Sequence, residues 1–388
     1  MPTLRAYLVV GVSTLAFVAQ SLALLSYPAV SSAVSNQFHL SNTQSGLVTS
    51  AFAVAYAITQ IPGGLLADRY GGARVLLLSL FVSSLSPLLF ILGGTYDLAI
   101  ASRAFAGASC GMILPAAVRL LSSWFSHAEL NKVMGLFGSG WGASQIVAFV
   151  VLPFLLVGGN WRLPLDFVIG FTLFVALLAV FPVMWKSEAD TLGARSVKVD
   201  IKGLFTRNLL ALTLPNFVSL VVLVGVFAWG SPFLTTKFAL SNVDAGRIVA
   251  LIGAMVIAAS FLGGYAAQRI GGRAVIAISM TLTVIFPILF GVSNSPFAAV
   301  LWVSGIGFAG TFYFAPVFAL VPYASKQGQA VAGIEFGVFN TLSNVGSFIS
   351  PVLFGYVLDS GGGFGTGFAI LGAFGLFGII GALLLRSN

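Results

Sequence analysis

Charged side chains are scarce in this sequence. Asp, Glu, Lys and Arg make up only 7% of its 388 residues, whereas an ordinary soluble domain has about 25%. Hydrophobic residues make up 58% of the chain, and apolar runs longer than about 18 residues, the length of a bilayer-spanning helix, recur throughout it. This composition predicts a polytopic membrane protein and excludes an ordinary soluble domain.

Cysteine and histidine are almost absent. Cys110 is the only cysteine, so no intrachain disulfide can form. His39 and His127 lie in or near expected loops without other metal-ligand residues, and we expect both to be solvated. The glycine-rich segments lack the Lys-Ser/Thr of a phosphate-binding loop, and no Ser-His-acid or paired-carboxylate set stands out. We therefore expect no cofactor, no metal and no enzymatic activity, and nothing indicates ATP-driven transport.

The basic residues lie mainly in short segments between apolar runs, so the net charge of +8 does not indicate a nucleic-acid partner. Cytoplasmic loops carry an excess of Lys and Arg. With the N-terminus inside, thirteen cations fall on the inner side: Arg5, Arg69, Arg74, Lys132, Lys186, Arg195, Lys198, Lys202, Arg207, Arg269, Arg273, Lys326 and Arg386. The outer side holds only Arg162, Lys237 and Arg247. We predict that both termini are cytoplasmic, in the cytoplasmic membrane of a prokaryote.

Twelve apolar segments are long enough to span a bilayer, and each must be helical because a helix satisfies its own backbone in lipid. The predicted spans are 6–33, 43–66, 73–94, 97–124, 131–157, 163–186, 208–236, 244–267, 273–293, 297–323, 330–358 and 364–386. A polar stretch separates the first six from the last six. We predict an N-terminal six-helix bundle over 1–186, a cytoplasmic linker over 187–207 and a C-terminal six-helix bundle over 208–388.

One polar stretch, Gly64-Leu-Leu-Ala-Asp-Arg-Tyr-Gly-Gly-Ala-Arg74, lies between the second and third spans. Charge is costly in hydrocarbon, so we expect a short loop at a membrane surface, where Gly71 and Gly72 allow a tight connection. The pattern returns as Gly264-Tyr-Ala-Ala-Gln-Arg-Ile-Gly-Gly-Arg-Ala274, at an offset of 200 residues (264 − 64).

The repeat extends beyond this stretch. Residues 38–46 resemble residues 238–246, and residues 87–90 resemble residues 287–290. Val133, Gly135 and Pro153 match Val331, Gly333 and Pro351 at an offset of 198 (351 − 153). Chance similarity between apolar helices is the alternative, but two of the matched segments are polar. The repeat predicts two copies of one six-span plan with the same topology.

These motifs resemble those of the major facilitator superfamily of secondary transporters. The family's signature between spans two and three is matched by Gly64, Asp68, Arg69, Gly71 and Arg74, and the second copy has Gln268 in place of the acid. The fourth span, Arg103-Ala-Phe-Ala-Gly107-Ala-Ser-Cys-Gly111, resembles the signature of that span. The fifth span lacks the Gly-Pro motif of many drug/proton antiporters, which favours a branch that carries small organic or inorganic anions. The arginines that the organic-phosphate branch uses in spans one and seven are absent here.

The resemblance implies an all-α membrane protein whose twelve helices form two pseudo-twofold-related six-helix bundles and work by alternating access. Spans one, four, seven and ten would line a central cavity. The resemblance also implies a cytoplasmic gate, formed here by Asp68, Arg69, Arg74, Arg119 and Arg269. Asp68 would meet the N-terminus of span eleven, a contact that stabilises by ~0.3–1 kcal/mol.

Three charged residues within the spans are candidates for function, because charge in the membrane is costly. Arg119, toward the inner end of span four, could pair with the cytoplasmic gate charges or with lipid phosphates. Arg103 could bind an anionic substrate or modulate a proton site, or it could be a structural arginine bonded to backbone carbonyls of neighbouring helices. Glu335 could take and release a proton, or it could pair statically with Arg69, Arg74 or another inner cation.

Several uncharged polar residues fall near the middle of their spans, where they could contact a substrate. Helix packing is the alternative for each. These residues are Gln20, Tyr56, Gln145, Tyr313, Asn340 and Asn344. Together with Arg103 they form the predicted substrate pathway.

We therefore predict a monomeric secondary transporter in the lipid bilayer that moves a small polar anion together with protons. The alternative is proton-coupled efflux of amphipathic drugs or lipids.

Overall fold

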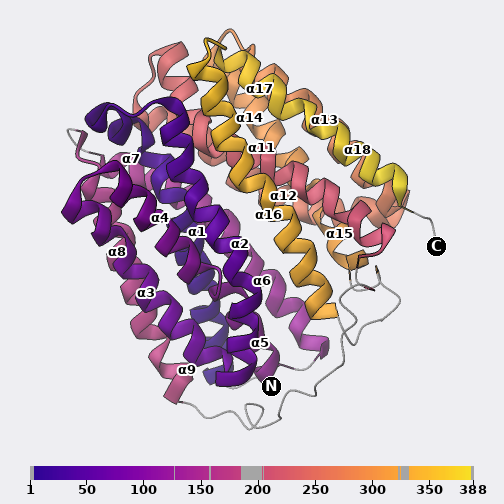
Figure 1. The fold of residues 1–388 in the computed structure, drawn as a ribbon. Helices are drawn as coiled ribbons and strands as arrows, with labels where there is room; N and C mark the ends of the chain where they lie inside the picture. Colours follow the sequence, from indigo (N-terminus) through magenta and orange to yellow (C-terminus); the bar gives the residue numbers. More distant parts are fainter. Residues whose placement is uncertain are drawn as a thin grey trace. The chain divides into compact units, whose positions relative to one another are not determined.

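The computed structural model describes residues 4–125, 127–156, 159–184, 203, 205–321, 324 and 332–385. Nearly all of these residues are helical, and the described chain has twelve segments long and apolar enough to cross a membrane (Figure 1). The all-α fold with twelve spans is thus confirmed. Most of the predicted linker lies outside the described residues.

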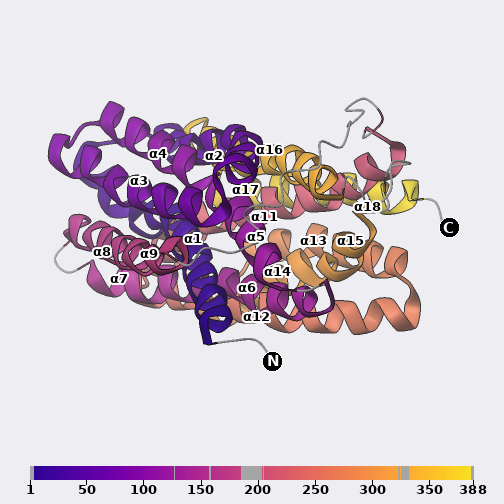
Figure 2. The same ribbon diagram turned by 90° about the horizontal axis from the view of Figure 1, so that it is seen from below.

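The chain forms two compact units, of which the first consists of residues 1–38 and 51–195. Its helices are α1 (Leu4–Phe38), α2 (Asn42–Tyr70), α3 (Gly72–Gly93), α4 (Tyr96–Cys110), α5 (Ile113–Trp124), α6 (His127–Ile146), a π-helix (Val147–Val151), α7 (Leu152–Leu155), α8 (Arg162–Leu178) and α9 (Val180–Met184). Helix α3 packs against α4, α5 and α8 (Figure 2), and α1 packs against α5, α6 and α8.

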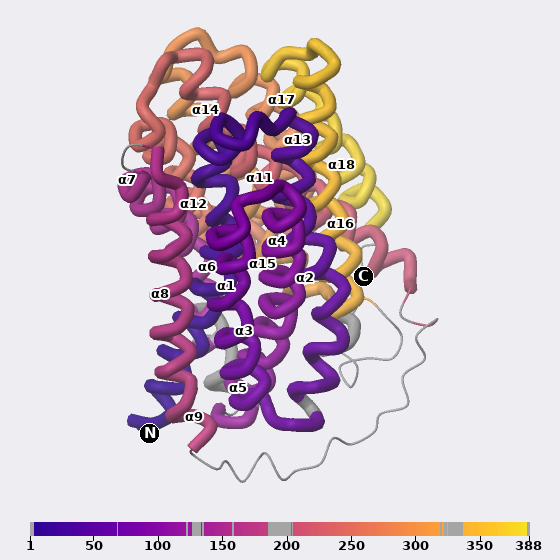
Figure 3. Tube along the Cα trace, turned by 60° about the vertical axis from the view of Figure 1, so that its left-hand side comes forward, coloured from indigo at the N-terminus to yellow at the C-terminus, as the bar shows by residue number. Residues whose placement is uncertain are grey.

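The second unit consists of residues 39–50 and 196–388. It therefore includes the first turns of α2. Its other described helices are α11 (Arg207–Phe238), α12 (Asn242–Ile270), α13 (Gly272–Gly291), α14 (Pro296–Phe312), α15 (Phe314–Leu320), α16 (Ala332–Asp359), α17 (Phe364–Ala373) and α18 (Gly375–Leu384). Helix α11 packs against α16 and α18, while α13 packs against α14, α17 and α18 (Figure 3).

The expected loop over 64–74 is much shorter in the structure. Helix α2 continues to Tyr70, α3 begins at Gly72, and Gly71 alone lies between them. The second copy has the same turn at Gly271, and the two glycines have φ of 88° and 83°. Helical backbone satisfies its own hydrogen bonds near the membrane surface while long charged side chains reach water. The predicted spans 43–66 and 73–94 leave residues 67–72 between them, so the predicted connection was a few residues too long.

Spans four and ten, each predicted as one segment, are broken by a short turn. The breaks fall at Gly111–Met112, between α4 and α5, and at Tyr313, between α14 and α15. Each break comes shortly before a proline, Pro115 or Pro316. Proline lacks the N–H that would bond the carbonyl four residues earlier, and its ring collides with that carbonyl. Both breaks therefore lie where a proline removes a helical hydrogen bond, whereas Pro28 and Pro87 lie inside uninterrupted helices.

The sequence repeat is visible in the backbone. His39 and Ala239 both have φ of 52°, the left-handed conformation that residues other than glycine rarely adopt. Two residues later, Ser41 Oγ accepts a hydrogen bond from Gln44 N at 3.2 Å and Ser241 Oγ accepts one from Asp244 N at 3.1 Å. Residues 200 apart (239 − 39) thus end one helix and begin the next in the same way, as the repeat predicts.

We predict that Gly271→Ala lowers the thermal midpoint of the purified protein. At φ 83° and ψ 147° a side chain strains the backbone by about 1–3 kcal/mol. No described atom lies within 4 Å of a Cβ built there, so we expect no contribution from a steric clash. Gly170→Ala in α8 is the control, because its Cβ also meets open space and alanine favours a helix. Equal shifts for the two variants in a detergent thermal-unfolding assay would contradict this account.

Candidate functional site

Arg103 on α4 is buried against α1 and bonds to its backbone. Its Nη1 donates to the carbonyl oxygen of Ala23 and to Ser26 Oγ (3.3 Å), and its Nη2 donates to the carbonyl oxygen of Leu24 at 2.7 Å. The Leu24 carbonyl is the one that Pro28, four residues later, leaves without a helical donor. Arg103 therefore replaces a hydrogen bond that the proline removes. This contact agrees with the alternative that Arg103 is a structural arginine bonded to backbone carbonyls.

The positive charge of Arg103 has no carboxylate partner among the described residues. Its other contacts are neutral: the guanidinium carbon lies 4.7 Å from the centroid of the Phe52 ring, and Nε has no hydrogen-bond acceptor in the described part of the chain. The residue is only 7% exposed. The first unit thus holds a buried cation that carbonyl dipoles and an aromatic face stabilise without neutralising it.

Gln20 and Tyr56, both predicted for the substrate pathway, lie together. Gln20 Nε2 donates to Tyr56 Oη at 3.0 Å, which joins α1 to α2. The Tyr56 ring stacks on Phe52, with centroids 6.0 Å apart, and Phe52 in turn lies against Arg103. Gln20 Oε1 is buried without a hydrogen-bond partner in the described residues. The structure therefore brings three of the predicted residues into one connected group.

Gln145 lies near the end of α6, just before the π-helix Val147–Val151. Its side chain is fully buried, yet neither Nε2 nor Oε1 has a hydrogen-bond partner in the described structure. An unsatisfied buried polar group costs about 1–3 kcal/mol, and π-helical turns occur often at functional sites. Gln145 is thus a predicted pathway residue whose polar atoms the described protein leaves unused.

Tyr313, Asn340 and Asn344 make contacts within the second unit. Tyr313 is fully buried and its Oη donates to Asn216 Oδ1 on α11 at 2.7 Å. Asn344 Nδ2 donates to the backbone oxygen of Asn340 at 2.8 Å, within α16. These bonds agree with the alternative that the three residues serve helix packing. Sequence reasoning missed Asn216, whose partner lies 97 residues away.

The predicted gate residues are described only in part. The side chains of Asp68 and Glu335 lie outside the described residues. Arg69 and Arg269 are exposed, and each guanidinium lies over a tyrosine ring of its own helix, at 5.3 Å from Tyr70 and 5.2 Å from Tyr265. Of the other two gate arginines, Arg74 is exposed and Arg119 is half-buried. The roles predicted for these residues stay predictions.

The sequence profile of the Major Facilitator Superfamily matches residues 11–332, which is most of the chain. The chain belongs to the Major Facilitator Superfamily. It is therefore an integral membrane transporter and not an enzyme, as the sequence motifs predicted.

Curated members of the superfamily are similar to this transporter over nearly its whole length. A protein of Bacillus subtilis, described as a probable galactarate/D-glucarate transporter (GudP), is 26% identical over 91% of this chain and 85% of its own. The cis,cis-muconate transport protein of Acinetobacter baylyi is 25% identical over 95% and 91%. Multidrug resistance protein 2 of Bacillus subtilis is 25% identical over 83% and 81%.

The same fold occurs in solved transporter structures. The crystal structure of a bacterial homologue of the human lysosomal transporter Spinster, in an inward-facing and occupied conformation, aligns with a TM-score of 0.77. The alignment covers 98% of this chain and 96% of that one at 17% sequence identity. This likeness concerns the fold alone.

We predict that Arg103→Gln destabilises this superfamily member more strongly when Pro28 is present. The substitution leaves the Leu24 carbonyl oxygen without a donor, at about 1–3 kcal/mol for one unsatisfied group, whereas the Ala23 carbonyl oxygen still accepts a hydrogen bond from Ser26 Oγ at 2.9 Å. Pro28→Ala would restore a helical N–H to the Leu24 carbonyl. The loss in thermal midpoint should therefore be smaller in the Pro28→Ala background.

The measurement is a double-mutant cycle of thermal midpoints in detergent for the parent, both single variants and the double variant. An equal loss in the two backgrounds would show that Arg103 does not act through the carbonyl that Pro28 leaves free.

Proposed function

We propose that this superfamily transporter is a secondary carrier that works by alternating access and moves a small polar anion together with protons. The buried, un-neutralised charge of Arg103 is the observation that carries the proposal. At an effective dielectric constant of 20, a unit negative charge 8 Å away would gain about 2 kcal/mol from it. A cation or a neutral amphipathic solute gains nothing comparable from such a site.

The relatives support an anionic solute. Galactarate, D-glucarate and cis,cis-muconate, which the names of two similar proteins give as their solutes, are anions of organic acids. Efflux of amphipathic drugs or lipids by proton antiport is the second candidate, because a multidrug resistance protein is similar too. The missing Gly-Pro motif in the fifth span and the charge of Arg103 favour the anion.

Hydrogen bonds to the solute would come from polar atoms that the helices do not already use. Gln145 is the best candidate, since both polar atoms of its amide are free of partners in the described structure. Gln20 and Tyr56 form a second polar group beside Arg103. Tyr313, Asn340 and Asn344 remain part of the proposed pathway, although their described bonds support helix packing.

For proton coupling we propose Glu335, a carboxylate predicted within span eleven near its inner end. The positions Asp68, Arg69, Arg74, Arg119 and Arg269 would control access at the cytoplasmic side. We further propose that the carrier is a monomer with both termini in the cytoplasm, in the cytoplasmic membrane of a bacterium. Two observations support this placement: the excess of Lys and Arg in the loops predicted to be cytoplasmic, and the bacterial origin of the relatives.

Gln145→Leu should separate stability from transport. Leucine is similar in size and has no polar atoms, so it removes an unsatisfied amide and should raise the thermal midpoint by a few degrees. The same change should reduce uptake of labelled galactarate or cis,cis-muconate into proteoliposomes at least tenfold. A loss of about this size is expected when a site loses a hydrogen bond to its solute.

Thr172→Val is the matched control for this test, because Thr172 Oγ1 on α8 is also buried without a partner in the described residues. We expect it to leave uptake unchanged. Normal uptake by Gln145→Leu would remove Gln145 from the pathway. Uptake of the dye ethidium in place of both acids, dependent on a pH gradient, would favour the drug-efflux alternative.

Glu335→Gln should abolish accumulation driven by a pH gradient, because glutamine cannot take up and release a proton. Downhill exchange of the same anion across the membrane should persist, since it needs no net proton movement. Uptake is measured in proteoliposomes with and without a pH gradient. Accumulation equal to that of the parent protein would rule out Glu335 as the coupling carboxylate.

A further inference from the structure

The last residue of α16 binds the first turn of α2. Asp359 Oδ1 accepts hydrogen bonds from the backbone N and the Nδ2 of Asn42, at 3.0 and 2.9 Å. Its Oδ2 accepts from the backbone N and the Oγ1 of Thr43, at 2.7 and 2.5 Å. One carboxylate thus takes four hydrogen bonds from two residues that lie more than 300 positions away in the sequence.

The carboxylate stabilises this end of α2 for two reasons. The first backbone N–H groups of a helix have no acceptor within the helix, and they give its N-terminus a positive partial charge that favours an anion. The first turn of α2 contains no acidic residue of its own. Asp359 therefore supplies an acid that α2 itself lacks.

Below this contact the two helices touch along small residues. A Cβ on Gly46 would lie 2.4 Å from the backbone oxygen of Pro351, and a Cβ on Gly355 would lie 2.4 Å from that of Asn42. Ser50 Oγ donates to the backbone oxygen of Phe348 at 2.6 Å. The contacts on α2 recur every four residues, at 42, 46 and 50, which places them on one face.

We call the contacts of residues 42–50 with residues 348–359 the α2–α16 seam. Large side chains from the two helices would interlock and resist separation, but glycine and serine let the backbones approach without interlocking. The seam can therefore open and close with little repacking, and its strongest directional bonds are the four at Asp359.

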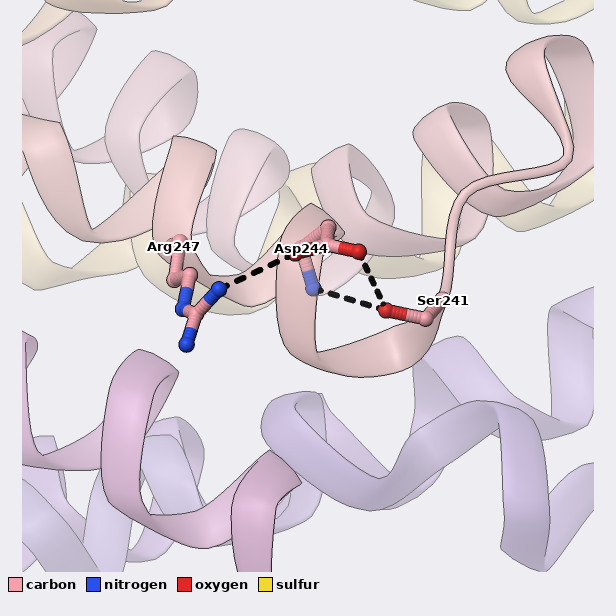
Figure 4. Close-up of polar contacts among 3 residues, drawn as sticks. All are labelled: Ser241, Asp244 and Arg247. Carbon is pink, nitrogen blue, oxygen red and sulfur yellow. Dashed lines mark hydrogen bonds and ion pairs between the residues drawn. The ribbon is translucent and has the colours of Figure 1, made fainter.

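The second copy of the repeat is built differently at the corresponding helix start (Figure 4). At the N-terminus of α12, Ser241 Oγ donates to Asp244 Oδ2 at 2.7 Å and Arg247 Nη1 lies 3.2 Å from Asp244 Oδ1. Gln44 stands in the first copy where Asp244 stands in the second, and Thr43 where Val243 stands. Helix α12 thus carries its own acid, whereas α2 takes its acid from the end of α16.

From this geometry we infer that Asp359 is a latch, a positioning residue that holds the α2–α16 seam closed in the state seen here and releases it during the transport cycle. The inference rests on the proposed alternating-access function, because such a carrier breaks contacts at one end of its helices as it forms others. Helix α2 continues without interruption from the seam into the first unit. Loss of the Asp359 bonds would therefore release the first turns of α2, which belong to the second unit, from α16.

The test measures how often the seam opens. Ser50 is only 4% exposed and lies on the seam, so a cysteine there reacts with a maleimide only when the seam opens. In a Cys110→Ala background that carries Ser50→Cys, we expect Asp359→Asn to raise the alkylation rate of the purified protein in detergent about 2- to 30-fold. This is the population change that loss of one helix cap produces. Thr43→Val should give a smaller increase, since it removes one of the four bonds.

Asp244→Asn is the control, because its carboxylate contacts only residues of its own helix start among the described residues. We expect no change in the labelling of Ser50→Cys. The inference is overturned if Asp359→Asn and Thr43→Val label at the parent rate, or if Asp244→Asn labels as fast as Asp359→Asn. Should Asp359→Asn fail to fold, Thr43→Val decides the question.

The labelling requires no solute, so its outcome is independent of the transport assays. Failed uptake of every tested anion with accelerated labelling of Asp359→Asn would overturn the proposed solute and leave the latch standing. Normal uptake with unchanged labelling would leave the proposed transport function standing and overturn the latch.

Discussion

In hydrocarbon, every backbone N–H and C=O must find a partner inside the protein, and this requirement governs the structure. Unbroken helices meet it by themselves. Prolines and helix ends do not, and the structure shows specific groups that compensate there. The Arg103 guanidinium bonds the Leu24 carbonyl that Pro28 leaves free. Ser86 Oγ does the same for the Ser83 carbonyl ahead of Pro87, at 2.7 Å. The compensating groups are polar, and so these interruptions are one source of the polar side chains inside the helix bundle.

The same compensating groups bear on the proposed function. Arg103 repairs α1 and also brings into the first unit a positive charge that has no carboxylate partner among the described residues, and the proposed anion specificity rests on that charge. Asp359 completes the first turn of α2 with bonds to an exposed carboxylate, which water can replace at small cost. A bond of that kind is suited to repeated opening, whereas the buried bonds of Arg103 are suited to permanence. Gln145 differs from Arg103 because neither polar atom of its amide has a hydrogen-bond partner in the described structure.

Much of the architecture could be predicted from the sequence, since span length, hydropathy and the repeat are local or periodic signals. The twelve spans and the repeated glycine turns at Gly71 and Gly271 followed from these signals. The loop at 64–74 was predicted too long, because charge marks the membrane surface and does not show where a helix ends. The contact of Asp359 with Asn42 and Thr43 was missed, since no local pattern joins residues more than 300 positions apart. Similarly, the lack of partners at Gln145 depends on packing that a sequence does not display.

The most direct test of a carrier that alternates between two states is counterflow. Proteoliposomes are loaded with a high concentration of unlabelled galactarate, D-glucarate or cis,cis-muconate, whichever raises the thermal midpoint of the purified protein by binding its folded state. Labelled solute is then added outside at trace concentration, without a pH gradient. The account predicts a transient overshoot of label inside, because loaded carriers return faster than empty ones. Equilibration of the label at the same rate with and without internal solute, or no binding and no flux for any of the three acids, would contradict it.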